Sequence, residues 1–149
     1  MPEEKYERLK LENQLCFPLY ACAREVIKQY KPFLDEVDLT YTQYITMMVL
    51  WERQSLTAKE LGEALFLDSG TLTPLLKKME AKGLLTRRRS ERDERSLVVT
   101  VTERGLALRD KAVTIPERMA ECGDLTPEEA AALYAILYKM LDRTPGKAE

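Results

Sequence analysis

The sequence predicts a mainly α-helical chain with one short β-hairpin. Most of its length carries apolar residues at helical spacing, and helix-start signals precede several of these stretches. Residues 84–89 and 96–102 read instead as two short β-prone runs on either side of a polar turn. The length of 149 residues, 45% of them hydrophobic and 32% charged, fits one soluble globular domain over residues 1–149.

Two capping sequences mark helix starts in the middle of the chain. "TYTQ" (40–43) and "TAKE" (57–60) each have a threonine followed three residues later by Gln or Glu. In this arrangement each side chain bonds the backbone N–H of the other residue and closes the first turn of a helix. We expect one helix from the first signal to Trp51 and a short helix from the second to about Leu65.

The next helix is indicated by apolar residues at i, i+3, i+4 and i+7, namely Leu72, Leu75, Leu76 and Met79. Gly83 should end it, because glycine is favoured at the left-handed residue that follows a helix. Proline is favoured only in the first turn of a helix, yet Pro74 comes after the start of the apolar stripe. The sequence therefore leaves the first residue of this helix open.

Two helices are expected after the hairpin. One starts near Thr102 and continues until it meets Pro116. The last begins with Thr126 as N-cap, Pro127 at the first helical position and Glu129 at the third.

The order helix, short helix, turn, helix and β-hairpin is that of a winged helix-turn-helix, whose second helix lies in a DNA major groove. With the apolar stripe of this helix inward, the outward residues are Gly70, Thr73, Pro74, Lys77 and Lys78. Small residues would let the backbone approach the groove, and the lysines would meet phosphates. A core helix with a solvated outer face fits this helix equally well, but it does not explain the basic hairpin that follows.

The net charge of −2 hides an uneven distribution. Between Lys77 and Arg95 there are eight Lys/Arg against four Asp/Glu, a local charge of +4, so the remainder carries −6. A basic segment on an acidic body indicates one face for a polyanion. A solvated charged hairpin is the other interpretation.

The chain contains three cysteines and no histidine. Without histidine, the sequence argues against a His-based catalytic triad and against an ordinary zinc site. We expect neither a metal nor a cofactor. The acidic N-terminus differs from a signal peptide, and no apolar run approaches the ~20 residues of a membrane span. We expect a cytoplasmic protein without membrane contact, whose thiols are reduced.

Residues 67–105, "LDSGTLTPLLKKMEAKGLLTRRRSERDERSLVVTVTERG", resemble the recognition helix and wing of MarR-type repressors, with the D-x-R of the wing tip at Asp93 and Arg95. The resemblance implies a non-enzymatic repressor that binds double-stranded DNA at a pseudo-palindromic operator. It assigns DNA contacts to Ser69, Thr71, Thr73, Lys77, Lys78, Arg87 and Arg95, and it adds Asp93 to the DNA-binding site as the residue that orients Arg95.

"LENQLCFPLYACAREVIKQY" (11–30) and "LTYTQY" (39–44) resemble more narrowly the OhrR subgroup, whose members sense organic hydroperoxides through a thiol. The likeness extends over about residues 11–142. Two departures are Pro18, where alanine is usual, and Val101, where leucine is common. Neither touches a proposed functional group.

The resemblance implies a homodimer, with residues of about 1–35 and 103–142 in the dimerisation region and about 55–101 in the DNA-binding lobe. The last helix supports this with a broad apolar stripe of Leu133, Ile136, Leu137, Met140 and Leu141. An intrachain core contact is the other interpretation.

Pro18 suggests that a helix begins around Phe17, because proline is tolerated only at a helix start. Cys16 would then lie at or just before a helix N-terminus, where unpaired N–H groups and the helix dipole favour a thiolate. Cys22 is six residues further on, rotated by about 240°, so the two sulfurs point apart. We interpret Cys16 as the reactive thiol and Cys22 as a small packed hydrophobe.

In the resembled family the sensing thiolate accepts hydrogen bonds from tyrosines at positions that match Tyr30 and Tyr41, with Tyr20 a weaker third. Phenols stabilise an anion without supplying a competing base. Each tyrosine alone is more often an amphipathic core residue. Together with Cys16 they are better explained as a site.

Cys122 lies in the linker between the helix at Pro116 and the cap at Thr126, where thiols are more exposed than inside helices. In the two-cysteine branch of the resembled subgroup, a second thiol near this point forms an intersubunit disulfide. The resemblance therefore makes Cys122 the candidate resolving thiol. Capping of Cys16 by a small cytosolic thiol is the other interpretation.

The main expectation is a repressor that leaves its operator when an organic hydroperoxide, its inducer, oxidises Cys16 to a sulfenic acid. Two other functions fit parts of the pattern. A MarR-type repressor would bind a phenolic ligand between the same helices, with Cys16 as a bystander. A thiol peroxidase would use the same cysteine, but the chain lacks a thioredoxin-like βαβ pattern and has the basic wing.

Overall fold

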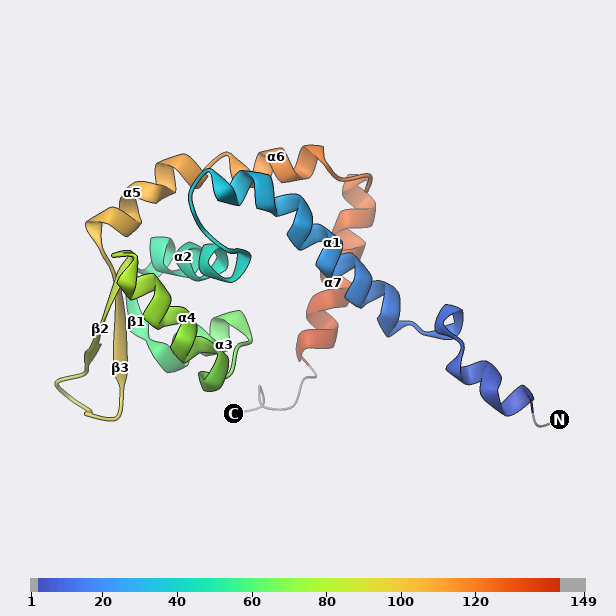
Figure 1. Cartoon of the computed structure of the whole chain (residues 1–149), viewed down its shortest axis with the longest axis horizontal. Helices are drawn as coiled ribbons and strands as arrows, with labels where there is room; N and C mark the ends of the chain where they lie inside the picture. Colours follow the sequence, from blue (N-terminus) through green and yellow to red (C-terminus); the bar gives the residue numbers. More distant parts are fainter. Residues whose placement is uncertain (1–2, 143–149) are drawn as a thin grey trace.

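The computed structural model describes residues 3–142 and shows a winged-helix lobe from which long helices extend (Figure 1). The predicted class, mainly α-helical with a β-hairpin wing, is confirmed. The short 3-10 helices are η1 (Glu4–Leu9) and η2 (Leu11–Asn13). The α-helices are α1 (Cys16–Asp35), α2 (Tyr41–Arg53), α3 (Ala58–Leu65), α4 (Ser69–Ala81), α5 (Glu103–Ala112), α6 (Ile115–Glu121) and α7 (Pro127–Asp142).

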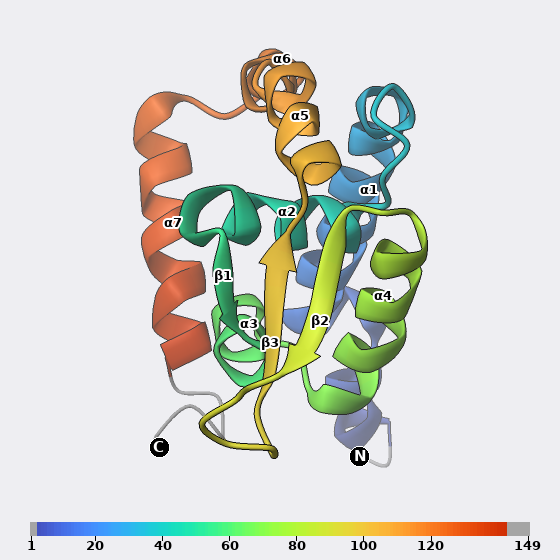
Figure 2. The ribbon, with the colours of Figure 1, turned by 90° about the vertical axis from the view of Figure 1, so that its left-hand side faces the viewer.

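The strands β1 (Ser55–Thr57), β2 (Leu85–Arg89) and β3 (Leu97–Val101) form an antiparallel sheet in the order β1-β3-β2 (Figure 2). The hairpin of β2 and β3 was predicted, and β1 was not. β1 pairs with β3 on the opposite edge from β2, with Leu56 opposite Val99. Three residues between two helices are too few to show a strand periodicity.

The predicted capping boxes are all present. The Gln43 N–H donates to Thr40 Oγ1 at 3.3 Å, and the Thr40 N–H donates to Gln43 Oε1 at 3.1 Å. The same reciprocal pair begins α3, and another, between Thr126 and Glu129, begins α7. These local bonds set where α2, α3 and α7 start.

The structure fixes the start of α4, which the sequence left open. Asp68 is the N-cap, and its carboxylate accepts the Thr71 N–H at 2.7 Å. Pro74 therefore lies inside the helix, where its ring removes the bond that an N–H would make to the Gly70 carbonyl. At the other end Gly83 has a φ of +77°, as predicted for the residue after a helix.

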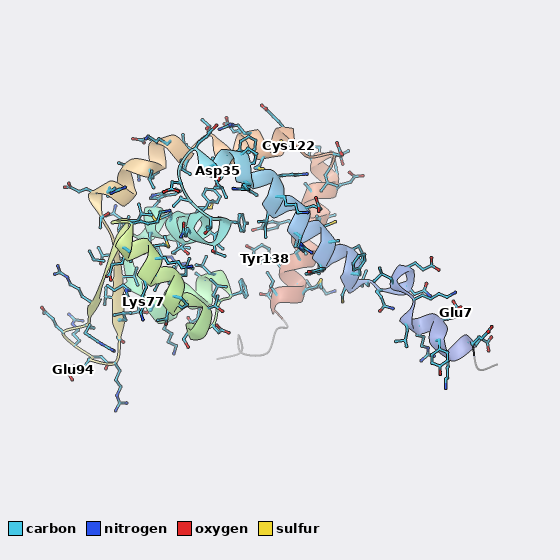
Figure 3. All side chains as sticks on the ribbon, viewed as in Figure 1. Glu7, Asp35, Lys77, Glu94, Cys122 and Tyr138 are labelled. Carbon is cyan, nitrogen blue, oxygen red and sulfur yellow. The ribbon has the colours of Figure 1, made fainter. Side chains whose placement is uncertain are left out.

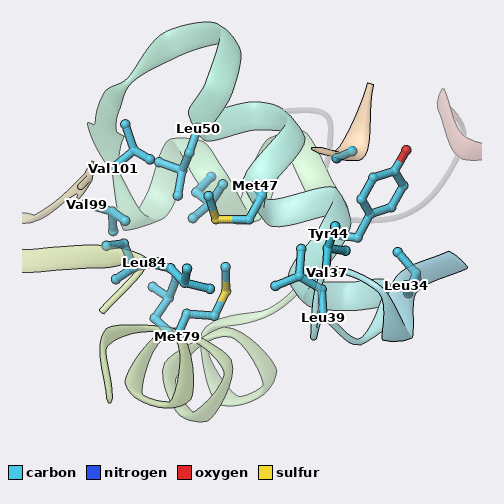
Figure 4. Close-up of a cluster of buried hydrophobic side chains, with 14 of the residues drawn as sticks. Leu34, Val37, Leu39, Tyr44, Met47, Leu50, Met79, Leu84, Val99 and Val101 are labelled. Carbon is cyan, nitrogen blue, oxygen red and sulfur yellow. The ribbon is translucent and has the colours of Figure 1, made fainter. Parts of the chain in front are cut away.

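The hydrophobic core joins α2, α4 and the sheet. Met47, Leu50, Met79 and Val99 are fully buried there (Figure 4). A second part of the same cluster lies where α1 meets α2 and contains Leu34, Val37, Leu39 and Tyr44 (Figure 4). The core thus fixes the C-terminal end of α1 on the winged lobe.

The helix expected from Thr102 to Pro116 ends a few residues early, and a second helix that the sequence did not predict follows it. α5 ends at Ala112, and α6 begins at Ile115 with Pro116 in its first turn. Proline lacks the N–H that a continuing helix would need at this position, so the chain breaks just before it. Ile115 is buried and anchors the start of α6 in the core.

The N-terminal half of α1 and all of α7 contact little of the rest of the chain. α7 has no buried residue, and the two helices stand apart when the molecule is turned (Figure 2). Large apolar side chains are exposed on both, including Phe17, Leu19, Val26, Ile27, Leu133, Tyr134, Ile136 and Met140. Within residues 3–142, no helix is both long and apolar enough to cross a membrane.

Candidate DNA-binding surface and thiol site

The outer face of α4 presents small polar and basic side chains. The core contacts of Leu72, Leu76 and Met79 orient this helix. The opposite face therefore exposes the five predicted contact residues on α4, which are Ser69, Thr71, Thr73, Lys77 and Lys78. Lys77 and the wing residue Glu94 lie at the same end of the molecule (Figure 3). One surface can thus present the helix and the wing together.

The wing tip is a turn organised by Asp93. One carboxylate oxygen of Asp93 accepts the Arg95 N–H at 3.0 Å, and its carbonyl accepts the Ser96 N–H at 2.9 Å. Arg89 supports the same turn by donating to the Glu94 carbonyl at 3.1 Å. Asp93 therefore shapes the backbone that carries Arg95, whose side chain is exposed to solvent.

Arg87 differs from the other predicted DNA contacts. Its side chain is only 18% exposed, and its Nη2 donates to Glu80 Oε1 at 3.1 Å. The Arg87 N–H also donates to Glu80 Oε2 at 3.0 Å, and these bonds lower the pKa of Glu80. This guanidinium ties β2 to the last turn of α4 and so fixes the wing on the recognition helix, while its predicted contact with DNA stays a prediction.

Lys82 at the end of α4 links this helix to the start of α2. Its ammonium donates to the Asp38 carbonyl and, at 3.3 Å, to Gln43 Oε1. Gln43 is also part of the α2 capping box, and it lies in the first turn of α2 between Tyr41 and Tyr44. The recognition helix is therefore in direct contact with the segment that carries these two tyrosines.

Cys16 is the first residue of α1, as expected from Pro18 two residues later. The N-cap residue Leu15 makes no side-chain cap, so the N–H groups of the first turn have no side-chain acceptor there. Such a helix end stabilises a nearby negative charge. The thiol is exposed. Within one chain Cys22 is exposed too, so the expected packing is not found there, because its face of α1 has no partner element in the same chain.

Three tyrosines cluster where α1 crosses α2. The ring centroids of Tyr30 and Tyr41 are 5.0 Å apart, and Tyr44 lies 5.9 Å from the first and 6.3 Å from the second. Burial raises the pKa of Tyr30 and of Tyr44 above the ordinary tyrosine value, and the neighbouring tyrosines add to this rise. Both phenols therefore stay protonated at neutral pH and can donate hydrogen bonds.

Tyr44 was missed by the sequence reasoning. Its spacing of three from Tyr41 places both on one face of α2, and this signal was available. Tyr20 lies outside the cluster on an exposed part of α1, where its hydroxyl accepts a bond from Arg24 at 3.3 Å.

Cys16 and the tyrosine cluster do not meet within one chain. Cys16 and Tyr30 are fourteen residues apart on α1, which separates them by roughly 21 Å along the helix axis. Tyr41 packs against Tyr30 and is therefore equally remote. A contact between the thiol and these phenols requires a second copy of the chain.

Cys122 is exposed at the C-terminal end of α6, as expected for a linker thiol. Its Sγ donates to the Arg118 carbonyl at 3.4 Å. It lies beside the end of α1 that carries Asp35, far from the wing tip (Figure 3). No group of three or more acidic or cysteine side chains within the described part of the chain could hold a metal ion.

Comparison with known proteins assigns this arrangement to a family. A family model described as the transcriptional regulator SarA/Rot matches residues 28–111. The organic hydroperoxide resistance transcriptional regulator of Bacillus subtilis is 51% identical over 140 residues, which cover 94% of this chain and 95% of that protein. The chain belongs to the OhrR subgroup of the MarR family.

Solved structures agree with this assignment. The OhrR-type chain described here is similar to reduced AbfR of Staphylococcus epidermidis bound to DNA, with a TM-score of 0.76 and 33% identity over 93% of this chain and 96% of that one. It is also similar to a disulfide-formed AbfR, with a TM-score of 0.60 and 33% identity over 95% and 97% of the two chains. Homologous regulators with the same winged helix thus bind DNA.

Proposed function

We propose that this OhrR-type protein is a DNA-binding repressor that senses organic hydroperoxides by oxidation of Cys16 and then releases its operator. One observation carries the proposal: an exposed cysteine, Cys16, is the first residue of a helix without a side-chain cap, in a chain that also exposes a basic recognition helix and wing. The similarity to a regulator named for organic hydroperoxide resistance supports it. A role on DNA implies a cytoplasmic location.

The proposed working unit is a homodimer. The exposed apolar side chains of α1 and α7 are too many for an isolated monomer, and a second copy of the same helices would cover them. Residues of about 1–35 and 103–142 would form the dimerisation region, and about 55–101 the DNA-binding lobe. Twofold symmetry would bring Cys16 of one copy to the tyrosine cluster of the other and would match a pseudo-palindromic operator.

The proposed chemistry uses this thiol directly. The Cys16 thiolate attacks the terminal oxygen of the hydroperoxide, the O–O bond breaks, the alcohol leaves after taking up a proton, and a sulfenic acid remains on sulfur. Tyr30 and Tyr41 would hold the thiolate by hydrogen bonds before this step and lose those bonds afterwards. Lys82 would transmit a movement of the start of α2 to α4, because its ammonium bonds both the loop before α2 and the α2 cap. The dimer would then no longer place two recognition helices in successive major grooves.

A substitution of Arg95 tests the proposed binding to DNA. Its exposed guanidinium at the wing tip can enter the minor groove, where negative potential is concentrated. We expect Arg95→Ala to weaken operator binding by about 1–3 kcal/mol in a titration with a labelled operator at moderate salt. Arg92→Ala removes the same charge from the same turn and should cost less. Equal losses for the two variants would mean that only the net charge of the wing matters.

Cys122 is proposed as the resolving thiol. In this step its thiolate attacks the sulfenic sulfur of the partner's Cys16, the S–O bond breaks, and water leaves as the disulfide forms. Stoichiometric cumene hydroperoxide should then give a covalent dimer on a non-reducing gel. Cys16→Ser or Cys122→Ser should abolish this dimer and Cys22→Ser should keep it. A wild-type chain that stays monomeric and gains the mass of an added small thiol would make Cys122 a bystander.

Operator release and peroxide consumption distinguish the proposed function from its two alternatives. Cumene hydroperoxide should release the operator, whereas salicylate should not. Release by salicylate alone would indicate a repressor controlled by a phenolic ligand. Continuous consumption of peroxide with a thiol reductant, at many turnovers per chain, would instead indicate a peroxidase.

A further inference from the structure

Arg118 holds the end of α6 on α1, one helical turn before Cys122. Its Nη1 lies 2.6 Å from Glu36 Oε2, and its Nη2 lies 3.0 Å from Glu36 Oε1, so the pair is bidentate. The guanidinium also stacks over the Phe33 ring at 4.2 Å from its centroid. Bidentate, stacked arginine fixes orientation as well as distance. The bonds from Arg118 lower the pKa of Glu36, so the carboxylate keeps its charge over the whole neutral range.

Besides this ion pair, two apolar side chains hold α6 on the rest of the chain. Ile115 anchors the first turn of α6, and Met119 packs against the core beside Arg118. From Ala120 to Ile136 every side chain is exposed. The thiol itself donates to the Arg118 carbonyl at 3.4 Å, so the backbone of Arg118 is also its direct support. The Arg118–Glu36 pair is therefore the main polar attachment just before the thiol.

We propose that Arg118 is a positioning residue for the disulfide step: it sets the direction in which Cys122 is presented to the oxidised Cys16 of a second copy. This proposal rests on the proposed role of Cys122 and adds a requirement to it. Formation of a disulfide demands that the two sulfurs approach within a narrow range of distance and angle. A thiol at the end of a loosely held helix would reach the geometry needed for a disulfide only rarely. The Arg118–Glu36 ion pair, which we call the clamp, keeps the Cys122 thiol on one part of the surface.

The Arg118–Glu36 ion pair can be broken at Glu36 and compared with a matched substitution at the adjacent residue. Glu36→Gln removes the carboxylate that holds Arg118, at a position 86 residues from Cys122 in sequence. Asp35→Asn makes the same chemical change at the adjacent residue, which pairs with Lys31 at 3.1 Å on the surface and does not bond Arg118. Arg118→Met keeps the aliphatic stem of the arginine and removes its charge and its bonds.

Two rates are measured after one equivalent of cumene hydroperoxide is added to the full-length protein. Trapping with dimedone in the Cys122→Ser background reports sulfenic acid formation at Cys16, and quenched non-reducing gels report the covalent dimer. We expect unchanged trapping in all variants, a wild-type rate of dimer formation for Asp35→Asn, and a rate about tenfold or more lower for Glu36→Gln and Arg118→Met. Added cysteine should still cap Cys16 at the wild-type rate, because that reaction does not use Cys122.

Two results would overturn the inference. One is equal dimer formation by Glu36→Gln and Asp35→Asn, and the other is an equal slowing of trapping and dimer formation, which would indicate general damage. Absence of a covalent dimer in the wild type is a different outcome, because it removes the proposed role of Cys122 itself.

Discussion

Cys16→Ser should give a repressor whose operator affinity is the same before and after treatment with cumene hydroperoxide. Serine matches the size of cysteine and accepts the same hydrogen bonds, so the reduced-state fold and DNA affinity should stay close to wild type. Its hydroxyl has no comparable nucleophilicity toward the O–O bond, so no sulfenic acid forms. The measurement is operator binding by fluorescence anisotropy with and without hydroperoxide.

Cys22→Ser is the matched control, since it removes another exposed thiol six residues along the same helix. It should release the operator like the wild type. If the Cys16 variant is still released while the Cys22 variant is not, Cys22 is the sensor.

Gly105→Ala should destabilise the fold by about 3 kcal/mol, at the upper end of the range for overpacking. A Cβ at this position would lie 2.3 Å from the Leu84 carbonyl oxygen and 2.8 Å from Val101 Cγ2. The Leu84 oxygen cannot easily yield, because it accepts the Thr102 N–H at 3.1 Å. The Gly105 carbonyl also accepts the Trp51 Nε1–H at 2.8 Å, so displacement of α5 would break the link to α2.

Urea denaturation at a fixed protein concentration measures this loss of stability. Gly70→Ala is the control, because its Cβ would meet only a carboxylate oxygen of Asp68 at 3.7 Å. That variant should be as stable as the wild type or slightly more stable, since alanine favours a helix over glycine. Equal stability of both variants would show that the contact of α5 with Leu84 and Val101 is loose.

The fold could be predicted where short-range chemistry decides it. The starts of α2, α3 and α7 depend on capping pairs only three residues apart, and the end of α4 depends on one glycine. β1 could not be predicted in the same way. Its three residues become a strand only because β3 lies beside them, and that pairing joins residues more than forty positions apart.

In the candidate site, too, the residues that depend on local sequence could be predicted and those that depend on distant contacts could not. The outward face of α4 follows from one periodicity, and Cys16 at a helix start follows from Pro18. The ion pair of Arg87 with Glu80 could not be predicted, because a run of basic residues does not show which arginine is paired within the chain. The distance between Cys16 and the tyrosines also lies beyond sequence reasoning, since a linear pattern does not state which copy supplies each group.

One titration shows whether the oxidation state of Cys16 controls operator affinity. Reduced wild-type protein on a labelled palindromic operator receives increasing fractions of one equivalent of cumene hydroperoxide. In each sample, anisotropy gives the bound fraction, and mass spectrometry of the Cys16 peptide gives the oxidised fraction. We expect the bound fraction to fall in proportion to the oxidation of Cys16 and to return when dithiothreitol restores the thiol. Full oxidation of Cys16 with unchanged binding, or release of the operator while Cys16 is still reduced, would contradict it.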